Sequence, residues 1–152
     1  MTSYLIDINL WVAMTWGKHR HHLEARKWMN SNPDARFLFC RLTMLGFLRL
    51  LTNEVIMGED TVCVGDAVAL YDAWMEDPRV EFAPELRGTE ALFRHAMAGF
   101  ANQPATKAIA DSYLVVVAEA YGSTVATLDE ALVKTAEMRQ VPSVLLAAAK
   151  SL

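Results

Sequence analysis

The chain has 152 residues, of which 53% are hydrophobic and 21% are charged. This composition excludes a largely disordered chain and allows a single domain, expected to span residues 1–152, to bury a core. No apolar run approaches the roughly 18 residues that a membrane helix needs, and Asp7 stands where a signal peptide would be apolar, so we expect a cytoplasmic protein. The net charge of −4 argues against a broad phosphate-binding surface, although carboxylates gathered around a metal ion would also make a chain acidic.

In the first half of the chain, short apolar segments alternate with segments of helical spacing. Residues 4–6 form an apolar strand that ends at Asp7, and residues 37–40 form a second buried strand. Three stretches place apolar residues on one side of a helix, namely residues 22–31, 42–51 and 66–75.

The second half continues the same alternation. Its predicted strands are residues 80–82, residues 124–127 and residues 144–147, the last of which could also begin a tail helix. Its predicted helices are residues 84–99, residues 105–120 with Gly122 as the C-terminal cap, and residues 129–140. Alternation of this kind predicts an α/β fold in which helices flank both faces of a single, doubly wound parallel sheet.

Three aspartates stand next to core segments, where an unpaired ionised carboxylate is costly. Asp7 follows the first strand, Asp111 lies near the start of the helix at residues 105–120, and Asp129 follows the strand at residues 124–127. Each has a simpler interpretation. Asp129 could be only a helix N-cap, Asp111 could act only on the helix dipole, and Asp7 could be a turn residue.

Together, the three aspartates favour a metal site. The functional crevice of a doubly wound sheet lies beyond the carboxyl ends of its strands, where Asp7, Asp111 and Asp129 can meet. Their mutual repulsion would then call for a cation, and hard oxygen ligands suit Mg²⁺ or Mn²⁺. Such ions activate water and stabilise the charge that builds on a phosphodiester, so the site predicts hydrolysis of a phosphate ester.

Four segments in chain order resemble motifs of the PIN-domain family and, within it, of the VapC toxins. The first is LIDINLWVA at residues 5–13, which is similar to the family's opening strand with its D-x-N pattern. The second is TMLGFLRL at residues 43–50, and the third is ADSYL at residues 110–114. The last is ATLDEAL at residues 126–132, which is similar to the closing T-x-D motif. The resemblance spans nearly the whole chain and implies a PIN-like α/β/α sandwich.

The resemblance implies a metal-dependent endoribonuclease toxin that acts on RNA, is neutralised by a cognate antitoxin and forms a homodimer. Asp7 and Asp111 would hold Mg²⁺ or Mn²⁺, and Asp129 would complete the acidic cluster. In supporting roles, Asn9 would hydrogen-bond to Asp7, and Thr127 would fix Asp129 or the water network. Arg49 would pair with an acid of the cluster or steer phosphate, with a plain surface role as the alternative.

One position departs from the family pattern. The family commonly places a glutamate in the second motif, where this chain has Gly46. The site could therefore work with three carboxylates or recruit another acid, for which Glu54 is a weak candidate and Glu59 and Asp60 are not. If position 46 faces the cluster, Gly46→Glu is expected to raise metal affinity.

Other conspicuous residues allow two interpretations each. The basic run at residues 18–22 could contact RNA phosphates at the rim of the site or be a solvated loop. Trp11 and Trp16 could stack on bases, although core or interface positions are more common. Cys40 and Cys63 show no disulfide or metal spacing, so both are interpreted as buried small hydrophobes.

Two rival functions remain open at this stage. In one, Gly46 signals decay of the site, and the protein is a catalytically weakened binding module that sequesters its antitoxin or an RNA. In the other, the chain is a different phosphate-handling α/β enzyme. That second rival is disfavoured because the sequence has no GxxxxGK[ST] or GxGxxG motif and no covalent-phosphate aspartate motif.

Overall fold

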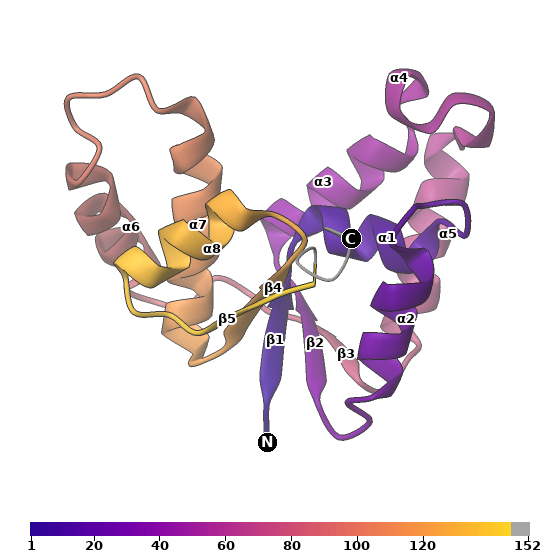
Figure 1. Cartoon of the computed structure of the whole chain (residues 1–152), viewed down its shortest axis with the longest axis horizontal. Coiled ribbons are helices and arrows are strands. Elements are labelled where there is room, and N and C mark those ends of the chain that lie inside the picture. Colours follow the sequence, from indigo (N-terminus) through magenta and orange to yellow (C-terminus); the bar gives the residue numbers. More distant parts are fainter. Residues whose placement is uncertain (147–152) are drawn as a thin grey trace.

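The computed structural model describes residues 1–146, in which five parallel strands form one sheet. The strand order is β3-β2-β1-β4-β5, with β1 at the centre (Figure 1). The strands are β1 (Ser3–Ile6), β2 (Arg36–Phe39), β3 (Val80–Phe82), β4 (Thr124–Thr127) and β5 (Ser143–Leu145). Along β1, Leu5 pairs with Leu38 on one side and with Val125 on the other. The predicted α/β class and parallel sheet are therefore confirmed.

Helices cover both faces of this sheet and form two arms (Figure 1). One arm holds α1 (Ile8–Thr15), α2 (His22–Asn30), α3 (Arg41–Leu51), α4 (Glu54–Met57), the short 3₁₀ helix Gly58–Asp60 and α5 (Val64–Met75). The other holds α6 (Thr89–Ala98), α7 (Thr106–Tyr121) and α8 (Glu130–Met138). Successive strand residues point to opposite faces, so Ile6 joins the core under α1 whereas Leu5 joins the core under α7.

The arrangement of the strands positions a crevice. From β1 the chain runs outward through β2 to β3, and then crosses to the other side of β1 to form β4. The order therefore switches between β1 and β4, whose carboxyl ends lie together: the backbone N–H of Asp7 donates to the carbonyl of Ala126 at 2.9 Å. Ligands of doubly wound sheets bind at such a switch point.

Three helices differ from the sequence-based expectation, and one of them is the four-residue α4, which the sequence analysis did not assign. The apolar residues after Asp7 form α1, which the sequence analysis did not assign, because a buried helix shows no polar face. Helix α6 begins at Thr89 and not at residue 84, because Gly88 has a φ of +93° and interrupts a helical path. The strand predicted at residues 144–147 is present as β5, and residue 147 lies outside the described residues.

The two cysteines also differ from each other. Cys40 is buried as expected, whereas Cys63 is exposed, which corrects the interpretation of both as core residues. Cys63 precedes α5 in a loop, and its thiol donates to Asp66 at 3.3 Å, so its position is set by the helix start. Among residues 1–146, none of the helices has the length and apolar character that crossing a bilayer requires.

Candidate active site

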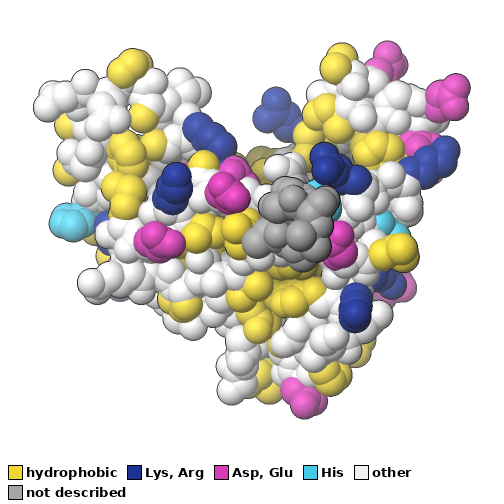
Figure 2. All heavy atoms as spheres, in the orientation of Figure 1, with side chains coloured by type: hydrophobic (Ala, Val, Ile, Leu, Met, Phe, Trp, Pro, Cys, Tyr) yellow, Lys and Arg dark blue, Asp and Glu magenta, His cyan; other side chains and the backbone are white. Residues whose placement is uncertain are grey.

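A cavity of about 340 Å³ opens at the carboxyl ends of β1 and β4. The molecule is hollowed between the two arms, with basic side chains on both sides of the hollow (Figure 2). Residues from both arms line the cavity: Asp7, Ile8, Asn9, Gly46, Arg49, Leu50, Asn53, Lys107, Asp111 and Asp129. The structure therefore brings the three aspartates singled out from the sequence into one cavity, although 104 positions separate Asp7 from Asp111.

Asp7 occupies the junction between β1 and α1. It is the N-cap of α1, and its Oδ1 accepts the backbone N–H of Ile8 at 2.8 Å. Its Oδ2 accepts the hydroxyl of Thr127 at 2.7 Å. Asp7 is therefore more than a turn residue, because its carboxylate caps the N-terminus of a helix.

Thr127, the last residue of β4, joins two of the aspartates. Its side chain is fully buried, and its hydroxyl donates to Asp7 while accepting the backbone N–H of Asp129 at 2.9 Å. Asp129 in turn caps α8, because its Oδ1 accepts the N–H of Ala131 at 2.9 Å. The N-cap interpretation of Asp129 is confirmed, and it leaves the second carboxylate oxygen facing the cavity.

Asp111 comes from the other arm and is held by a residue that the sequence analysis missed. It is the sixth residue of α7 and therefore lies beyond the first turn, where the helix dipole would act most strongly. The ammonium group of Lys107 donates to Asp111 Oδ2 at 2.8 Å and to Asp129 Oδ2 at 2.6 Å. A lysine four residues before an acid on a helix was the signal that could have revealed this pair.

The surroundings shift the pKa values of these groups in opposite directions. Burial raises the pKa of Asp7, and the nearby charges of Asp111 and Asp129 add to that effect, against the hydrogen bonds from Thr127 and Ile8. Burial also acts to raise the pKa of Asp129, but the hydrogen bonds and charge of Lys107 outweigh it and lower that pKa. The two carboxylates likewise raise the pKa of Lys107 despite its partial burial.

The side chains present fit a hard divalent cation. Within residues 1–146, no three Asp, Glu, His or Cys side chains are grouped tightly enough to form a ready metal site. However, two carboxylates of the cavity already converge on one positive group, and Asp7 interacts electrostatically with both of them. The available donors are carboxylate oxygens, which Mg²⁺ and Mn²⁺ prefer.

Gly46, at the position where the family commonly has a glutamate, lines the cavity, but the space beside its Cα is occupied by a neighbouring side chain. A Cβ added to Gly46 would lie 2.2 Å from Cδ1 and 2.7 Å from Cγ1 of Ile8. The side chain of Ile8 therefore occupies the space through which a residue at position 46 would have to pass. A side chain at position 46 and the side chain of Ile8 therefore cannot both occupy this space as it stands.

The remaining predicted residues have mixed outcomes. Asn9 and Arg49 both line the cavity with exposed side chains, but the hydrogen bonds that reach Asp7 in the described residues come from Ile8 and Thr127. Glu54 is not among the lining residues, whereas its neighbour Asn53 is. Asn53 caps α4, and its Oδ1 accepts the backbone N–H groups of Val55 and Ile56, the second and third residues of that helix.

The basic run at residues 18–22 does not line this cavity, because it follows the far end of α1. Lys18 forms an ion pair with Asp60 at 3.4 Å, and the Nδ1 of His22 is hydrogen-bonded to the carbonyl of Ala13. The indole N–H of Trp16 also donates to Asp60, at 2.8 Å. These contacts agree with the interpretation of residues 18–22 as a loop and not as part of the rim of the cavity.

Trp11 is a core residue and not a base-stacking one. It is fully buried and stacks on Phe39, with ring centroids 3.8 Å apart. The alternative of RNA stacking is wrong for Trp11, because a ring with no exposed surface cannot meet a base. The face of α1 that carries this ring packs instead against the sheet.

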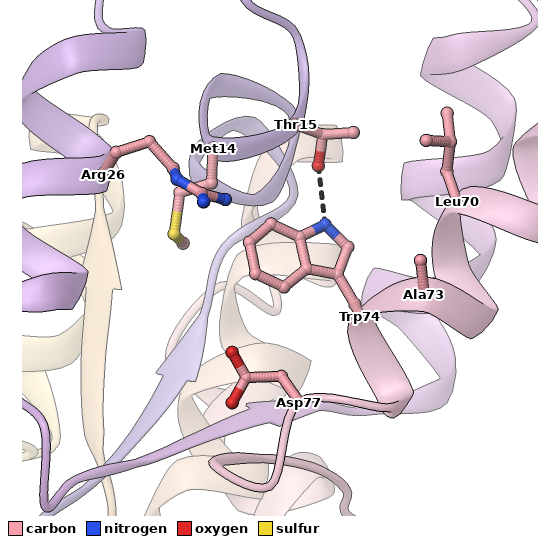
Figure 3. Close-up of a pocket in the computed structure, with 7 residues that line it drawn as sticks. All are labelled: Met14, Thr15, Arg26, Leu70, Ala73, Trp74 and Asp77. Carbon is pink, nitrogen blue, oxygen red and sulfur yellow. Dashed lines mark hydrogen bonds between the residues drawn. The ribbon is translucent and has the colours of Figure 1, made fainter.

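A second cavity, of about 300 Å³, lies at the other end of α1 (Figure 3). It is lined by Met14 and Thr15 of α1, Arg26 of α2, Leu70, Ala73 and Trp74 of α5, and Asp77 in the turn after α5. The indole N–H of Trp74 donates to the hydroxyl of Thr15 at 2.8 Å, and the guanidinium of Arg26 lies 5.3 Å from the Trp74 ring. This cavity lacks the paired acids that distinguish the first.

Comparisons with known proteins relate most of the chain to one family. Residues 4–138 match the model of the PIN domain. Ribonuclease VapC41 of Mycobacterium tuberculosis is 35% identical over 134 residues, which cover 84% of this chain and 89% of the relative.

Solved structures agree with this relationship at the level of the fold. VapBC2 of Rickettsia felis, bound to a DNA fragment from its promoter, superposes with a TM-score of 0.68 at 9% identity, covering 95% of this chain and 98% of that chain. VapC20 of Mycobacterium tuberculosis, a toxin that cleaves the sarcin-ricin loop, superposes with a TM-score of 0.62 at 15% identity, covering 86% and 93%.

Proposed function

Since this chain belongs to the PIN-domain family, with VapC ribonucleases among its relatives, we propose that it is an endoribonuclease toxin that hydrolyses RNA phosphodiester bonds with a divalent cation. The observation that carries the metal-dependent chemistry is the gathering of Asp7, Asp111 and Asp129 in one cavity at the strand switch point. These three side chains would hold Mg²⁺ or Mn²⁺.

The roles of the residues follow from their positions. A bound divalent cation would supply the activation of water and the neutralisation of charge on the phosphate. Thr127 fixes the orientation of Asp7 and the position of Asp129 through its buried hydroxyl. Arg49 is exposed on the α3 side of the cavity and would contact an RNA phosphate beside the reacting group. Asn9 also lines the cavity with an exposed side chain and would support Asp7.

The proposed partners are RNA, a cognate antitoxin and a second copy of the chain. Solved relatives of this fold include VapBC complexes from Haemophilus influenzae and Salmonella typhimurium, which supports an antitoxin partner. RNA as substrate would place the activity in the cytoplasm. Co-expression with an adjacent small open reading frame, followed by affinity purification and size-exclusion chromatography with light scattering, tests the antitoxin and the homodimer in one preparation.

Substitution of the aspartates tests the proposed chemistry. Asp7→Asn and Asp111→Asn are each expected to lower Mn²⁺-dependent RNA cleavage by at least about 100-fold, because several kcal/mol of charge stabilisation depend on the cation. Both variants should stay folded in metal-free buffer: Asp7→Asn lowers the like-charge repulsion at a buried carboxylate, whereas Asp111→Asn loses its ion pair with Lys107 and should be slightly less stable than the wild type. The measurements are cleavage of a fluorescent RNA and thermal unfolding followed by circular dichroism.

Two controls make the outcome decisive. Asp72→Asn, which removes an exposed acid on α5, should leave cleavage unchanged. Chelation with EDTA should abolish cleavage by the wild-type protein. If both site variants keep wild-type activity, the assignment of the site is rejected.

The same experiment separates the enzyme from a binding module. One observation favours a weakened site. Gly46 stands where the family commonly has a glutamate, and the side chain of Ile8 fills the space that a side chain at position 46 would need. A binding module would bind RNA in a gel-shift assay but would produce no new RNA ends with either Mg²⁺ or Mn²⁺. Sequencing of RNA ends after induced expression distinguishes the two and identifies the cleaved RNA.

A further inference from the structure

Lys107 stands apart from the other residues of the cavity because it is a cation placed between two acids. Its ammonium nitrogen lies 2.8 Å from Asp111 Oδ2 and 2.6 Å from Asp129 Oδ2. Both distances are those of charge-assisted hydrogen bonds, and no other basic side chain of the described residues forms an ion pair with either acid. One positive group therefore holds together α7 and the start of α8.

The three side chains of this cluster differ in how far they are exposed to water. The side chain of Asp111 is 16% exposed and that of Asp129 is 27% exposed, so both acids are partly withdrawn from water. Lys107 itself is 60% exposed and reaches down from the first turn of α7. A flexible, accessible lysine above two fixed, less accessible carboxylates is a group that can move away without unfolding the site.

We propose that Lys107 is a built-in counter-cation that stabilises the metal-free site and competes with the divalent cation for the carboxylates of Asp111 and Asp129. The inference rests on the proposed function only in that the incoming cation is a divalent metal ion. It explains why two of the acids converge on one ammonium group.

Competition has two measurable consequences. Removal of the ammonium group should leave Asp111 and Asp129 facing each other without a counter-charge, so the metal-free protein should melt at a lower temperature. The same removal should free both carboxylates, so Mn²⁺ should bind more tightly and raise the melting temperature by more than it does in the wild type.

The test compares Lys107→Met with Lys107→Arg and with Lys134→Met, which removes an exposed lysine from α8. Calorimetric titration with MnCl₂ alone should give a dissociation constant about fivefold lower for Lys107→Met, and values near the wild type for the other two. In EDTA, Lys107→Met should melt at a lower temperature, and the double variant Lys107→Met/Asp111→Asn should recover, because the repulsion is gone.

The outcomes separate this inference from the proposed function. If Lys107→Met binds Mn²⁺ no more tightly than the wild type, or if neither protein binds it, the inference is overturned. An unchanged melting temperature of Lys107→Met in EDTA also overturns it. If the titrations follow the expected order while the wild-type protein cleaves no RNA, the inference stands and the ribonuclease proposal fails.

Discussion

A single hydroxyl group at the end of β4 connects the aspartate of the first strand with that of the fourth. Thr127 is fully buried, donates to Asp7 and accepts from the backbone of Asp129. A buried group that makes one hydrogen bond as donor and one as acceptor cannot be replaced by an apolar side chain without leaving both partners unsatisfied. The predicted role of Thr127 in fixing Asp129 therefore extends to Asp7.

Substitution of this threonine gives a test at the level of single atoms. Thr127→Val should lower the free energy of unfolding by about 1–3 kcal/mol and lower RNA cleavage by about tenfold, whereas Thr127→Ser should retain most of both. Urea unfolding and a cleavage assay measure the two effects. Equal behaviour of the Val and Ser variants would contradict a role for the hydroxyl group.

Gly46 and Ile8 give a second test. Gly46→Glu alone should not tighten Mn²⁺ binding and should lower the free energy of unfolding by about 1–3 kcal/mol, because its Cβ would collide with the β-branched, stiff side chain of Ile8. The sequence alone predicts instead that the single substitution raises metal affinity, and the titration decides between the two expectations. The double variant Ile8→Ala/Gly46→Glu has the space that the single variant lacks.

The comparison uses calorimetric Mn²⁺ titration and urea unfolding. Gly65→Glu is the matched control, because nothing lies within 4 Å of a Cβ at that position on α5. Tighter binding by Gly46→Glu without any loss of stability would mean that Ile8 turns aside at little cost. Tighter binding by the double variant alone would show that the two positions act as a pair.

Among the secondary-structure elements, the starts of the helices carry much of the site. Asp7 caps α1, Asp129 caps α8 and Asn53 caps α4, so each of these cavity residues also satisfies backbone N–H groups at a helix start. The caps fix the direction of the side chains before any ligand binds. Element ends thus supply both local stability and the chemistry of the cavity.

An ion pair between Asp77 and Arg79, directly before β3, is expected to make stability depend on pH. Asp77 accepts the backbone N–H of Arg79 at 2.9 Å and the Arg79 guanidinium at 3.0 and 3.2 Å. The same guanidinium donates to the carbonyl of Met29 and lies 5.6 Å from the Phe37 ring. Arg79 therefore ties β3 to α2 and β2.

The hydrogen bonds and charge of Arg79 lower the pKa of Asp77 below its usual value. A carboxyl group whose pKa is lower in the folded state adds stability that is present at neutral pH and lost as pH falls below about 4 toward the lowered pKa. Asp77→Asn should thus cost about 1–2 kcal/mol at pH 7 and progressively less in acid. Urea unfolding from pH 7 to pH 3 measures this, and a pH-independent difference would contradict the electrostatic cause.

For the whole molecule, the two arms create an opening above the carboxyl ends of the strands (Figures 1 and 2). Arg49 and Lys107 are the two basic residues that line the cavity there, and the chain as a whole carries a net charge of −4. A protein of this kind neutralises few phosphates when it binds a single strand. Its affinity for RNA should therefore depend only weakly on salt.

The salt dependence can be measured with a single-stranded RNA and the Asp7→Asn variant, which is expected not to cleave it. A plot of log K against log[KCl] should have a slope of about −1.5, because each of two phosphate contacts contributes about −0.7. Arg49→Met should reduce the slope by about 0.7, and Arg94→Met, which breaks an exposed pair with Glu90 on α6, should not change it. A slope steeper than about −4 would indicate a broad basic surface instead.

The order of strands and helices follows from local patterns, and the sequence therefore allowed the parallel α/β fold and most element positions to be predicted. Helix α1 was missed because buried helices lack the polar face that reveals a period, and α6 was begun too early because only the backbone at Gly88 shows where it starts. The organisation of residues 1–152 as a single domain stays a prediction.

The gathering of the three aspartates in one cavity could be predicted from the sequence, because a carboxylate beside a buried strand is costly unless a polar or charged partner lies near it. The catalytic and metal-binding roles of Asp7, Asp111 and Asp129 stay predictions. The tertiary structure alone decided which side chains surround them: Lys107 between two acids, Ile8 in the space beside Gly46, and Asn53 in place of Glu54. These contacts join segments that are far apart in the chain. They depend on how the two arms pack across the sheet, and no local pattern of residues encodes that packing.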